Sequence, residues 1–443
     1  MAEAAADETR LRWYQGVSRY CWIVLIIAAL GWLFDTMDQN IFTLVAQPAV
    51  KDLVQHLFPD AQLQGAVNYY RGVITSVFLL GWAVGGAVFG ILGDRIGRTR
   101  TMVFTILIYA MFTGLSGTAH TWWQLAIFRF LTALGVGGEW AAGASLVAEV
   151  FPQRSRPMAL GTLQALSAVG NMTAALICYV LAAVSWRWAF AVGIFPALVV
   201  VWIRRSLKEP ERWQHAKEVA AHDVRKELGA IGDLFTDPVL RRNTIAAVLL
   251  ATAGVGGLWG VGFWTPDLLT IVLKPLNIAP DQVSRYRSMM FFVQQVGAFF
   301  GMYAYAIFSE RTNRRGALLV FFILAWAAVE GMFWTTHTFG QAIIWALVLG
   351  FCTLGPFSAY TVYFPELYPT RLRATGCGFC YNCARVLAAG APWVLGALSR
   401  HFAEAHGPDM GFRIAAGIVA CIYVVGLVGL AMAPETKGKP LPE

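Results

Sequence analysis

The chain has 443 residues, of which 57% are hydrophobic and only 14% are charged. Soluble globular domains carry nearer a quarter of charged residues, so this composition excludes an ordinary soluble protein and indicates a polytopic membrane protein. The net charge of +8 does not indicate nucleic-acid binding, because the basic residues stand in short clusters between apolar segments, where they set membrane topology. The cysteines are scattered, mostly inside apolar segments, which argues against a disulfide framework.

Apolar segments long enough to cross a bilayer recur along the whole chain. The longest polar interval divides them six and six, so we predict an all-α membrane protein with twelve transmembrane helices. The predicted spans are 20–47, 71–92, 101–119, 123–148, 157–184, 188–206, 243–266, 288–308, 316–336, 340–364, 374–397 and 411–432. The predicted units are a tail at 1–19, six spans at 20–206, a linker with an interfacial amphipathic helix at 207–242, six spans at 243–432 and a tail at 433–443.

Loop charge predicts the orientation of these spans. Lys and Arg are concentrated in the segments that face the inside when both termini are cytoplasmic. This asymmetry satisfies the positive-inside rule. We therefore predict a multi-pass protein of the plasma (inner) membrane with both termini in the cytoplasm.

Two acidic residues, Asp35 and Asp38, lie inside the first apolar segment. Their spacing puts both on one face of a helix, and a carboxylate at that depth usually faces a protein interior or a watered cavity. Arg129 of the fourth span lies near the depth of Asp38, so we predict that one Asp pairs with Arg129 when ionised and is released by protonation. The alternative is a permanent structural pair. Glu139, deeper in the fourth span, is either a second proton-coupling site or a polar packing partner.

Charged motifs between the spans repeat in the two halves. The segment 90–98, GILGDRIGR, follows the second span, and 309–315, SERTNRR, follows the eighth. The segment 149–156, EVFPQRSR, follows the fourth span, and 366–373, ELYPTRLR, follows the tenth. Because the members of both pairs are separated by almost the same number of residues, we interpret the chain as a duplicated six-helix unit.

At these residues the chain resembles the major facilitator superfamily. The pattern at 90–98 looks like the signature loop of that superfamily, and KEPERW at 208–213 and PETKG at 434–438 are similar to motifs of its sugar-porter and organic-ion branches. The resemblance, which extends to metabolite and organic-acid:proton symporters, implies two six-helix bundles that rock around a central site. It also implies that loop charges form a cytoplasmic latch, against the alternative of solvated charges that only set topology. The implied latch residues are Asp94, Arg95, Arg98, Glu149, Arg156, Glu310, Arg314, Glu366 and Arg373.

Arg385 lies near the middle of the eleventh span. An arginine cannot easily neutralise itself, and the other spans of the C-terminal half carry no carboxylate near that depth. We predict that a substrate carboxylate binds it bidentately, and its position resembles the arginine of organic-anion members of the superfamily. The alternative is a pair with Asp35, Asp38 or Glu139. Polar and aromatic residues of the central spans complete the predicted substrate site: Tyr381, Asn382, Gln164, Asn171, Gln294, Gln295, Tyr360 and Trp259.

The sequence has no P-loop, which disfavours an ATP-driven pump. We predict a non-enzymatic secondary transporter without cofactor or metal, a monomer, that couples proton flow to symport of a small organic anion such as a monocarboxylate or aromatic acid. Its expected partners are this substrate, protons and membrane lipid, but not nucleic acid. The alternatives are a proton-coupled sugar or polyol symporter, with Arg385 as an internal counter-ion, and an organic-cation carrier. A non-transporting receptor built on the same scaffold is the alternative outside transport.

Overall fold

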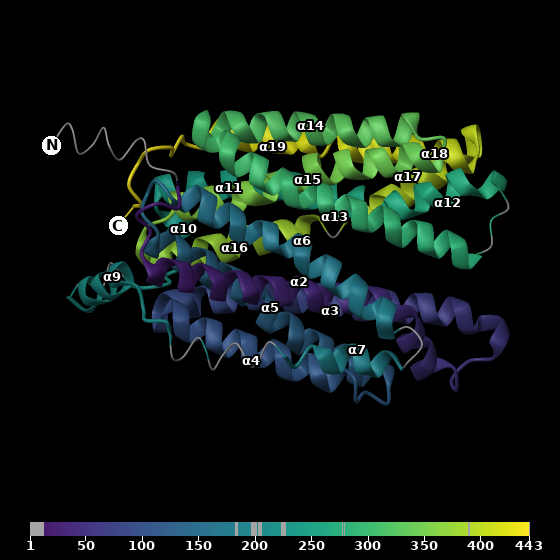
Figure 1. Cartoon of the computed structure of the whole chain (residues 1–443), viewed down its shortest axis with the longest axis horizontal. Helices are drawn as coiled ribbons and strands as arrows, with labels where there is room; N and C mark the ends of the chain where they lie inside the picture. The colour runs from purple at the N-terminus through teal and green to yellow at the C-terminus, as the bar shows by residue number, and fades with distance from the viewer. Residues whose placement is uncertain are drawn as a thin grey trace.

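The computed structural model describes residues 13–181, 185–195, 202, 206–222, 227–276, 278, 280–388 and 390–442. Long helices run side by side in two layers, with the N-terminal half below and the C-terminal half above in Figure 1. The N-terminal half contains α2 (Arg19–Val54), α3 (Asp60–Ile96), α4 (Arg98–Ser116), α5 (Trp122–Val150), α6 (Arg156–Leu181) and α7 (Trp186–Val192). The linker contains α9 (Glu211–His222) and α10 (Asp233–Thr236).

The C-terminal half repeats this arrangement with more interruptions. It contains α11 (Pro238–Gly260), η2 (Gly262–Trp264), α12 (Thr265–Leu273), η3 (Lys274–Leu276), α13 (Pro280–Arg311), α14 (Arg314–Thr335), α15 (Phe339–Leu367), η4 (Thr370–Leu372), α16 (Arg373–Ala388), α17 (Ala391–His406), α18 (Pro408–Ala420) and α19 (Tyr423–Met432). The linker helices α9 and α10 and the C-terminal segment that follows α19 lie at one end of the helices (Figure 1). This end is called the α9 end below.

Local sequence explains where several helices begin and end. Ser18 and Thr121 cap α2 and α5, because each side chain accepts a backbone N–H of the first turn. Gly97, between α3 and α4, has a φ of 116°, which glycine adopts without steric cost. The chain therefore reverses sharply there, and Arg98 at the start of α4 folds back onto Asp94 near the end of α3.

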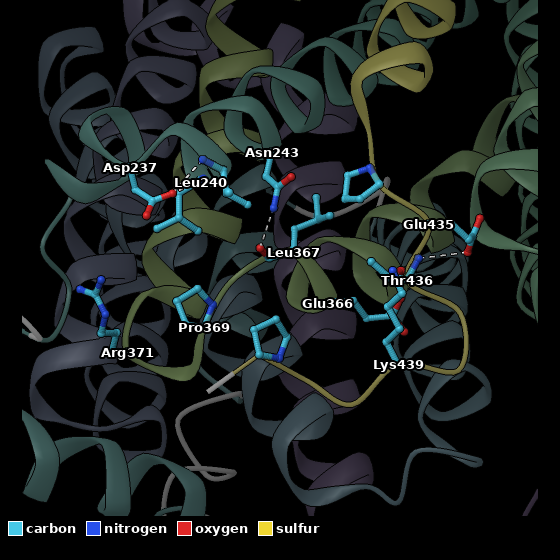
Figure 2. Close-up of a pocket in the computed structure, with 13 residues that line it drawn as sticks. Asp237, Leu240, Asn243, Glu366, Leu367, Pro369, Arg371, Glu435, Thr436 and Lys439 are labelled. Carbon is cyan, nitrogen blue, oxygen red and sulfur yellow. Dashed lines mark hydrogen bonds between the residues drawn. The ribbon is translucent and has the colours of Figure 1, made fainter.

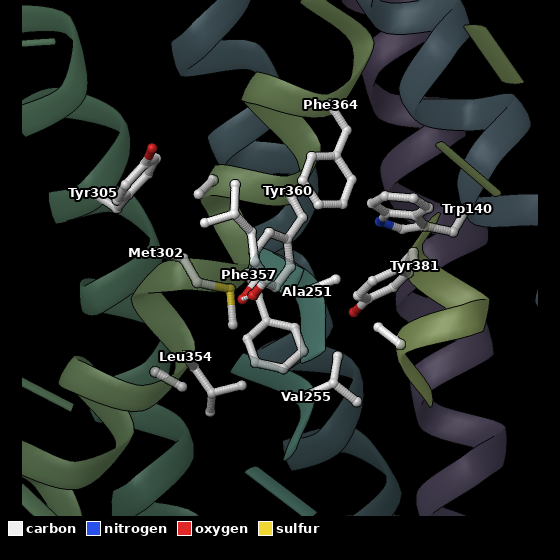
Figure 3. Close-up of a cluster of buried hydrophobic side chains, with 14 of the residues drawn as sticks. Trp140, Ala251, Val255, Met302, Tyr305, Leu354, Phe357, Tyr360, Phe364 and Tyr381 are labelled. Carbon is white, nitrogen blue, oxygen red and sulfur yellow. Dashed lines mark hydrogen bonds between the residues drawn. The ribbon is translucent and has the colours of Figure 1, made fainter. Parts of the chain in front are cut away.

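The two halves meet where α3 packs against α16 and α6 packs against α13. Glycine allows the first pair to approach closely, since a Cβ added at Gly86 of α3 would lie 1.7 Å from Nδ2 of Asn382 on α16. Buried aromatic side chains fill the space around this crossing, among them Trp140 of α5 and Tyr381 of α16 (Figure 3). The middle of α3 and of α16 therefore lies at the boundary between the halves.

Most predicted spans correspond to observed helices. Ten helical segments of the described chain are long and apolar enough to cross a membrane. The predicted span 374–397 is divided between α16 and α17, and most of the predicted span 188–206 lies outside the described residues. Both α3 and α13 begin well before their predicted apolar segments, at Asp60 and Pro280. Hydropathy detects the apolar part of a helix and not its polar extension. The predicted starts of these two helices are therefore too late in the sequence.

Candidate functional site

Arg385 lies in α16 against two aromatic rings. Its Cζ atom is 4.0 Å from the ring centroid of Trp82 on α3 and 3.9 Å from that of Tyr381 on its own helix. Nη1 donates to Oδ1 of Asn382 at 2.7 Å, and the residue is only 7% exposed. Within the described chain no carboxylate forms an ion pair with Arg385, so cation–π contacts, the Asn382 amide oxygen and the Tyr381 hydroxyl stabilise this buried charge.

Trp140 of α5 connects this cluster to the N-terminal half. Its ring centroid is 4.4 Å from that of Tyr381, and the two rings lie side by side in Figure 3. Nε1 of Trp140 donates to Oε1 of Gln164 on α6 at 3.2 Å, and the same oxygen accepts the Thr361 hydroxyl of α15 at 2.9 Å. Gln164, Tyr381, Asn382 and Arg385 are therefore brought into one buried network across the two halves.

A second polar chain joins α2, α6 and α13. Nδ2 of Asn40 donates to Oδ1 of Asn171 at 2.7 Å. Nδ2 of Asn171 in turn donates to Oε1 of Gln295 at 2.9 Å. These bonds bring two of the predicted substrate-binding residues together at the boundary between the halves.

The remaining predicted substrate-binding residues are Tyr360, Gln294 and Trp259, all in helices of the C-terminal half. The hydroxyl of Tyr360 donates to the carbonyl of Leu250 at 2.8 Å, which commits it to packing inside the C-terminal half. Gln294 is 4% exposed and lies one residue before Gln295 on α13. Trp259 lies one residue before the end of α11 and packs partly buried against the core.

Asp38 is the acid of α2 that pairs with Arg129. Nη1 of Arg129 lies 3.0 Å from Oδ2 of Asp38, and the Thr113 hydroxyl donates to Oδ1 at 2.7 Å. The rings of Phe42 and Phe78 lie 4.8 Å and 4.6 Å from the Arg129 Cζ atom. This is a fully buried ion pair whose carboxylate oxygens both have donors, which offsets part of the cost of removing two charges from water.

Asp35 is buried against Glu139 of α5 rather than against a cation. Both carboxyl groups are at most 1% exposed, and their oxygens find no donor among the described groups. The two groups are neighbours, and two carboxylates are both acceptors, so a bond between them requires a proton on one. Gly31 makes room for this arrangement, because a Cβ there would lie 2.1 Å from Oε1 of Glu139.

The acid pair and Arg385 lie at similar depth. With a rise of about 1.5 Å per residue, Glu139 lies about 17 Å from the α9 end of α5. Arg385 lies about 18 Å from the α9 end of α16 by the same reasoning. Trp140, which follows Glu139 in the chain, contacts Tyr381. A carboxyl pair and a guanidinium group therefore stand on the two sides of one aromatic cluster.

The first copy of the repeated loop motif crosses between the halves at the α9 end. Arg98 lies 2.7 Å from Asp94 and 3.0 Å from Glu149. Arg373 of the other half lies 2.7 Å from the same Glu149 oxygen. Asp94 also accepts the backbone N–H and the hydroxyl of Thr375 at 2.7 Å and 2.6 Å. All four charged groups are buried, so this network fastens α3 and α5 to the start of α16.

The second copy stays inside the C-terminal half. Arg314 lies 3.2 Å from Glu310 and 3.1 Å from Glu366, and the Glu310 side chain is 39% exposed. Arg156, the counterpart of Arg373, donates through Nε to the carbonyl of Ala148 at 2.9 Å. Within the described chain these bonds do not cross to the other half, although the charge of Arg156 interacts with Glu366 of the C-terminal half. The latch role of these residues stays a prediction.

The linker and the C-terminal segment cover this end. Arg95 pairs with Glu227 of the linker at 2.5 Å, with both side chains at least half exposed. Glu435 accepts the backbone N–H groups of Arg314 and Arg315 at 3.0 Å and 3.1 Å. Burial tends to raise the pKa of Glu435, but these and neighbouring backbone donors hold that pKa below its ordinary value. Beside the segment lies a cavity of about 420 Å³ (Figure 2), lined by Asp237, Val239, Leu240, Asn243, Glu366, Leu367, Pro369, Arg371, Pro434, Glu435, Thr436, Lys439 and Pro442.

Three residues of these sites were not predicted from the sequence. Trp82 and Trp140 contact the Arg385 cluster, and Thr113 binds Asp38. Tryptophan in membrane proteins gathers at the two interfaces, so a tryptophan in the middle of a span is the signal that could have found Trp82 and Trp140. Thr113 carries no such signal, because one hydroxyl in an apolar span is common.

Comparison with known proteins identifies the family. The family model described as Major Facilitator Superfamily matches residues 27–392. The chain belongs to the Major Facilitator Superfamily. It is therefore a multi-pass membrane transporter and not an enzyme, with the twelve-helix, two-bundle fold of that superfamily, as predicted.

Relatives and solved structures agree with this assignment. The chain is 32% identical to a probable 4-methylmuconolactone transporter of Cupriavidus pinatubonensis, over 92% of this chain and 89% of the relative. It is 28% identical to a cis,cis-muconate transport protein of Acinetobacter baylyi, over 83% of this chain and 86% of the relative. Among solved structures, the proton:xylose symporter XylE matches with a TM-score of 0.76 and 17% identity, over 95% of this chain and 98% of that chain. That likeness concerns the fold alone.

Proposed function

We propose that this major facilitator transporter is a proton-coupled symporter that takes up a small organic anion, a monocarboxylate or an aromatic acid, by alternating access. The observation that carries the proposal is Arg385, a buried guanidinium group with no carboxylate partner in the described chain. A substrate carboxylate would supply the counter-charge through paired hydrogen bonds. The names of the two relatives, which concern methylmuconolactone and muconate, support an organic-acid substrate.

The surroundings of Arg385 favour a substrate with an apolar face. Trp82, Tyr381 and Trp140 present rings around the guanidinium group, and Asn382 and Gln164 add polar groups. A mostly aromatic lining with a few polar groups is typical of sites for small molecules. The same rings would pack against the carbon skeleton of an aromatic or conjugated acid.

The two alternatives within transport have less support. A sugar symporter would need Arg385 to be an internal counter-ion, yet Arg129 is the arginine that pairs with an acid of α2. An organic-cation carrier would need free acids at the centre, but Asp38 is neutralised by Arg129. The Asp35 and Glu139 carboxyl groups remain, and we assign them to the proton.

The loop network at the α9 end suits alternating access. We assign the protein to the plasma (inner) membrane, with this end and both termini facing the cytoplasm. We assign a monomer as the working unit. In this conformation the bonds among Asp94, Arg98, Glu149 and Arg373 hold the halves together on that side. Binding of substrate and proton would shift the balance towards a state in which these bonds are broken.

The test is transport and binding by the purified protein in liposomes with an imposed pH gradient. A panel of monocarboxylates and aromatic acids is compared with sugars, polyols and organic cations. We expect acids to accumulate, and Arg385→Ala to weaken their binding by at least about thirtyfold, because a buried charge pair loses one partner. Arg187→Ala, which removes an exposed pair with Asp52, is the matched arginine control. Wild-type affinity in Arg385→Ala, or accumulation of sugars instead of acids, would refute the proposal.

A further inference from the structure

Trp82 faces Arg385 from the opposite half of the molecule. Its ring centroid lies 4.0 Å from the Arg385 Cζ atom, and its side chain is 4% exposed. One turn further along α3, Gly86 lets the backbone approach Asn382 of α16. Trp82 and Arg385 therefore form one of the contacts between the two halves at the α3 and α16 crossing.

The indole nitrogen of Trp82 has no hydrogen-bond acceptor in the part of the chain that the structure describes. Nε1 is buried and finds no partner among the described residues. Buried indole N–H groups usually have an acceptor, because an unpaired donor loses its bonds to water without replacement. The nearby Trp140 follows this rule, since its Nε1 donates to Gln164. Among the described residues, Trp82 is thus an unpaired indole donor beside a guanidinium group that has no anion.

The chemistry of these two groups points to one shared acceptor. A guanidinium group has several N–H donors and no acceptor, and an indole has one donor and no acceptor. Asn382 supplies one oxygen to Arg385 and the Tyr381 hydroxyl is a second, neutral acceptor beside it, but neither group carries the negative charge or the paired oxygens of a carboxylate. A carboxylate has two oxygens and accepts about four hydrogen bonds, so it can satisfy both residues at once.

We propose that Trp82 is a carboxylate ligand of the substrate site and donates its Nε1–H to the same carboxylate that Arg385 binds. The proposal rests on the proposed function, because it presumes an anion at Arg385. It goes beyond that function by adding a ligand from the other half of the molecule. The carboxylate then bonds to α3 and to α16 together, so a bound acid links the two bundles at this crossing, and a neutral analogue of the acid forms a weaker link.

The test removes the indole donor and keeps an aromatic ring. Trp82→Phe is compared with the wild type for binding of two acids, benzoate and cis,cis-muconate, and of their neutral counterparts, benzamide and the dimethyl ester of cis,cis-muconate. We expect Trp82→Phe to bind the acids roughly 10- to 100-fold more weakly, the effect of one hydrogen bond to a charged group. Binding of the neutral compounds should weaken by a smaller factor, at most about three- to tenfold, since a hydrogen bond to a neutral acceptor is roughly half as strong as one to a charged acceptor.

Two further variants separate the donor from packing. Trp264 of η2 is another tryptophan whose buried Nε1 has no partner in the described chain, and it packs against Phe412 of α18. Trp264→Phe should leave acid binding within about twofold of the wild type. Trp82→His, assayed at pH 8 where an ordinary imidazole is neutral, keeps a ring donor and should recover part of the preference for acids. If Trp82→Phe does not fold, Trp82→His, which keeps a donor, is compared with Trp82→Leu, which has none. The quantity measured is again the ratio of acid affinity to neutral-compound affinity.

The outcomes separate this inference from the proposed function. Equal acid binding by Trp82→Phe and the wild type, with binding lost in Arg385→Ala, would overturn the role of Trp82 and leave the organic-anion proposal standing. Equal weakening of acids and neutral compounds would show that the ring acts by packing and would overturn the role as well. Wild-type acid binding in Arg385→Ala, or no binding of either acid by the wild type, would overturn both.

Discussion

Asp35 and Asp38 lie on the same face of α2, yet their surroundings are opposite. Asp38 binds Arg129 at 3.0 Å and accepts the Thr113 hydroxyl at 2.7 Å. Asp35 has no donor in the described chain and is buried against Glu139. Tyr109 of α4 is a further titratable side chain near Asp35, Asp38 and Glu139. Asp38, whose charge is balanced by an arginine, therefore lies one turn of helix from Asp35, which has no cation beside it in the described chain.

This difference indicates different roles for the two acids. A carboxylate held by a buried arginine keeps its charge, because protonating it would leave the guanidinium group unpaired in a medium of low dielectric. Two neighbouring buried carboxyl groups cannot both be ionised at low cost, and their protons belong to the pair. We infer that Asp38 and Arg129 hold the bundle together, whereas Asp35 and Glu139 carry the transported proton. The hypothesis that protonation releases the Arg129 pair stays a prediction, and the variants below distinguish it from this one.

The largest effect should come from Asp35→Asn. An amide cannot release a proton, so we expect accumulation of the acid driven by a pH gradient to be abolished. Exchange of labelled for unlabelled acid across the same liposomes should persist, because Arg385 and its rings are unchanged. Both activities are measured in one preparation by counterflow and by uptake under an imposed gradient. Accumulation at the wild-type level in Asp35→Asn would reject the assignment of the proton to this pair.

The next largest effect should be on stability, in Asp38→Asn. This variant leaves Arg129 buried without an anion, and we expect the free energy of unfolding to fall by about 3–5 kcal/mol. Asp35→Asn removes an acid that has no cation, so it should leave that free energy unchanged or raise it. Thermal and denaturant unfolding in detergent would measure both variants.

A double variant checks the physical reason for this loss. In Asp38→Asn/Arg129→Met the unpaired charge is gone and an apolar side chain of similar length remains, so most of the lost stability should return. If the double variant is as unstable as Asp38→Asn, the loss comes from the hydrogen bond of Thr113 or from packing. If Asp35→Asn is the less stable single variant, the roles of the two acids are reversed.

The depth of Asp35, Asp38 and Arg129 in the membrane could be predicted from the sequence, but which acid binds the arginine could not. Hydropathy and the helical rise placed Asp38 and Arg129 at one level, and a pair between α2 and α5 followed from the cost of unpaired charge. Which acid takes the arginine depends on the rotation of α2 about its own axis. Residues three apart share a face, so their spacing does not decide it. Packing decides it, through Thr113 of α4 and the space that Gly31 leaves for Glu139.

For the repeated loops, too, the sequence predicted the charged groups but not the partners that each one binds. Their sequences predicted a duplicated unit, and the Major Facilitator Superfamily match agrees with it. In the structure Asp94 is fully buried and binds Thr375 of the other half, whereas Glu310 is 39% exposed at its side chain and bonds within its own half. The C-terminal segment bonds to the second motif through Thr436 and Glu366, whereas the first motif bonds across the halves through Asp94 and Thr375. A motif defines the groups available for bonding and leaves the choice of partners to the packing around it.

The smallest effect, and the sharpest geometric test of the acid pair, is expected from Gly31→Ala. The added Cβ would lie 2.1 Å from Oε1 of Glu139, so the flexible carboxyl group must leave its place beside Asp35. Such a displacement costs about 0.5–1.5 kcal/mol, and we expect proton-driven uptake to slow by about two- to tenfold with acid binding unchanged. Gly143→Ala is the matched control, because its Cβ would meet the same Glu139 oxygen at 3.7 Å, an ordinary contact. Equal slowing in both variants would mean that helix packing, and not the position of the Glu139 carboxyl group, limits the rate.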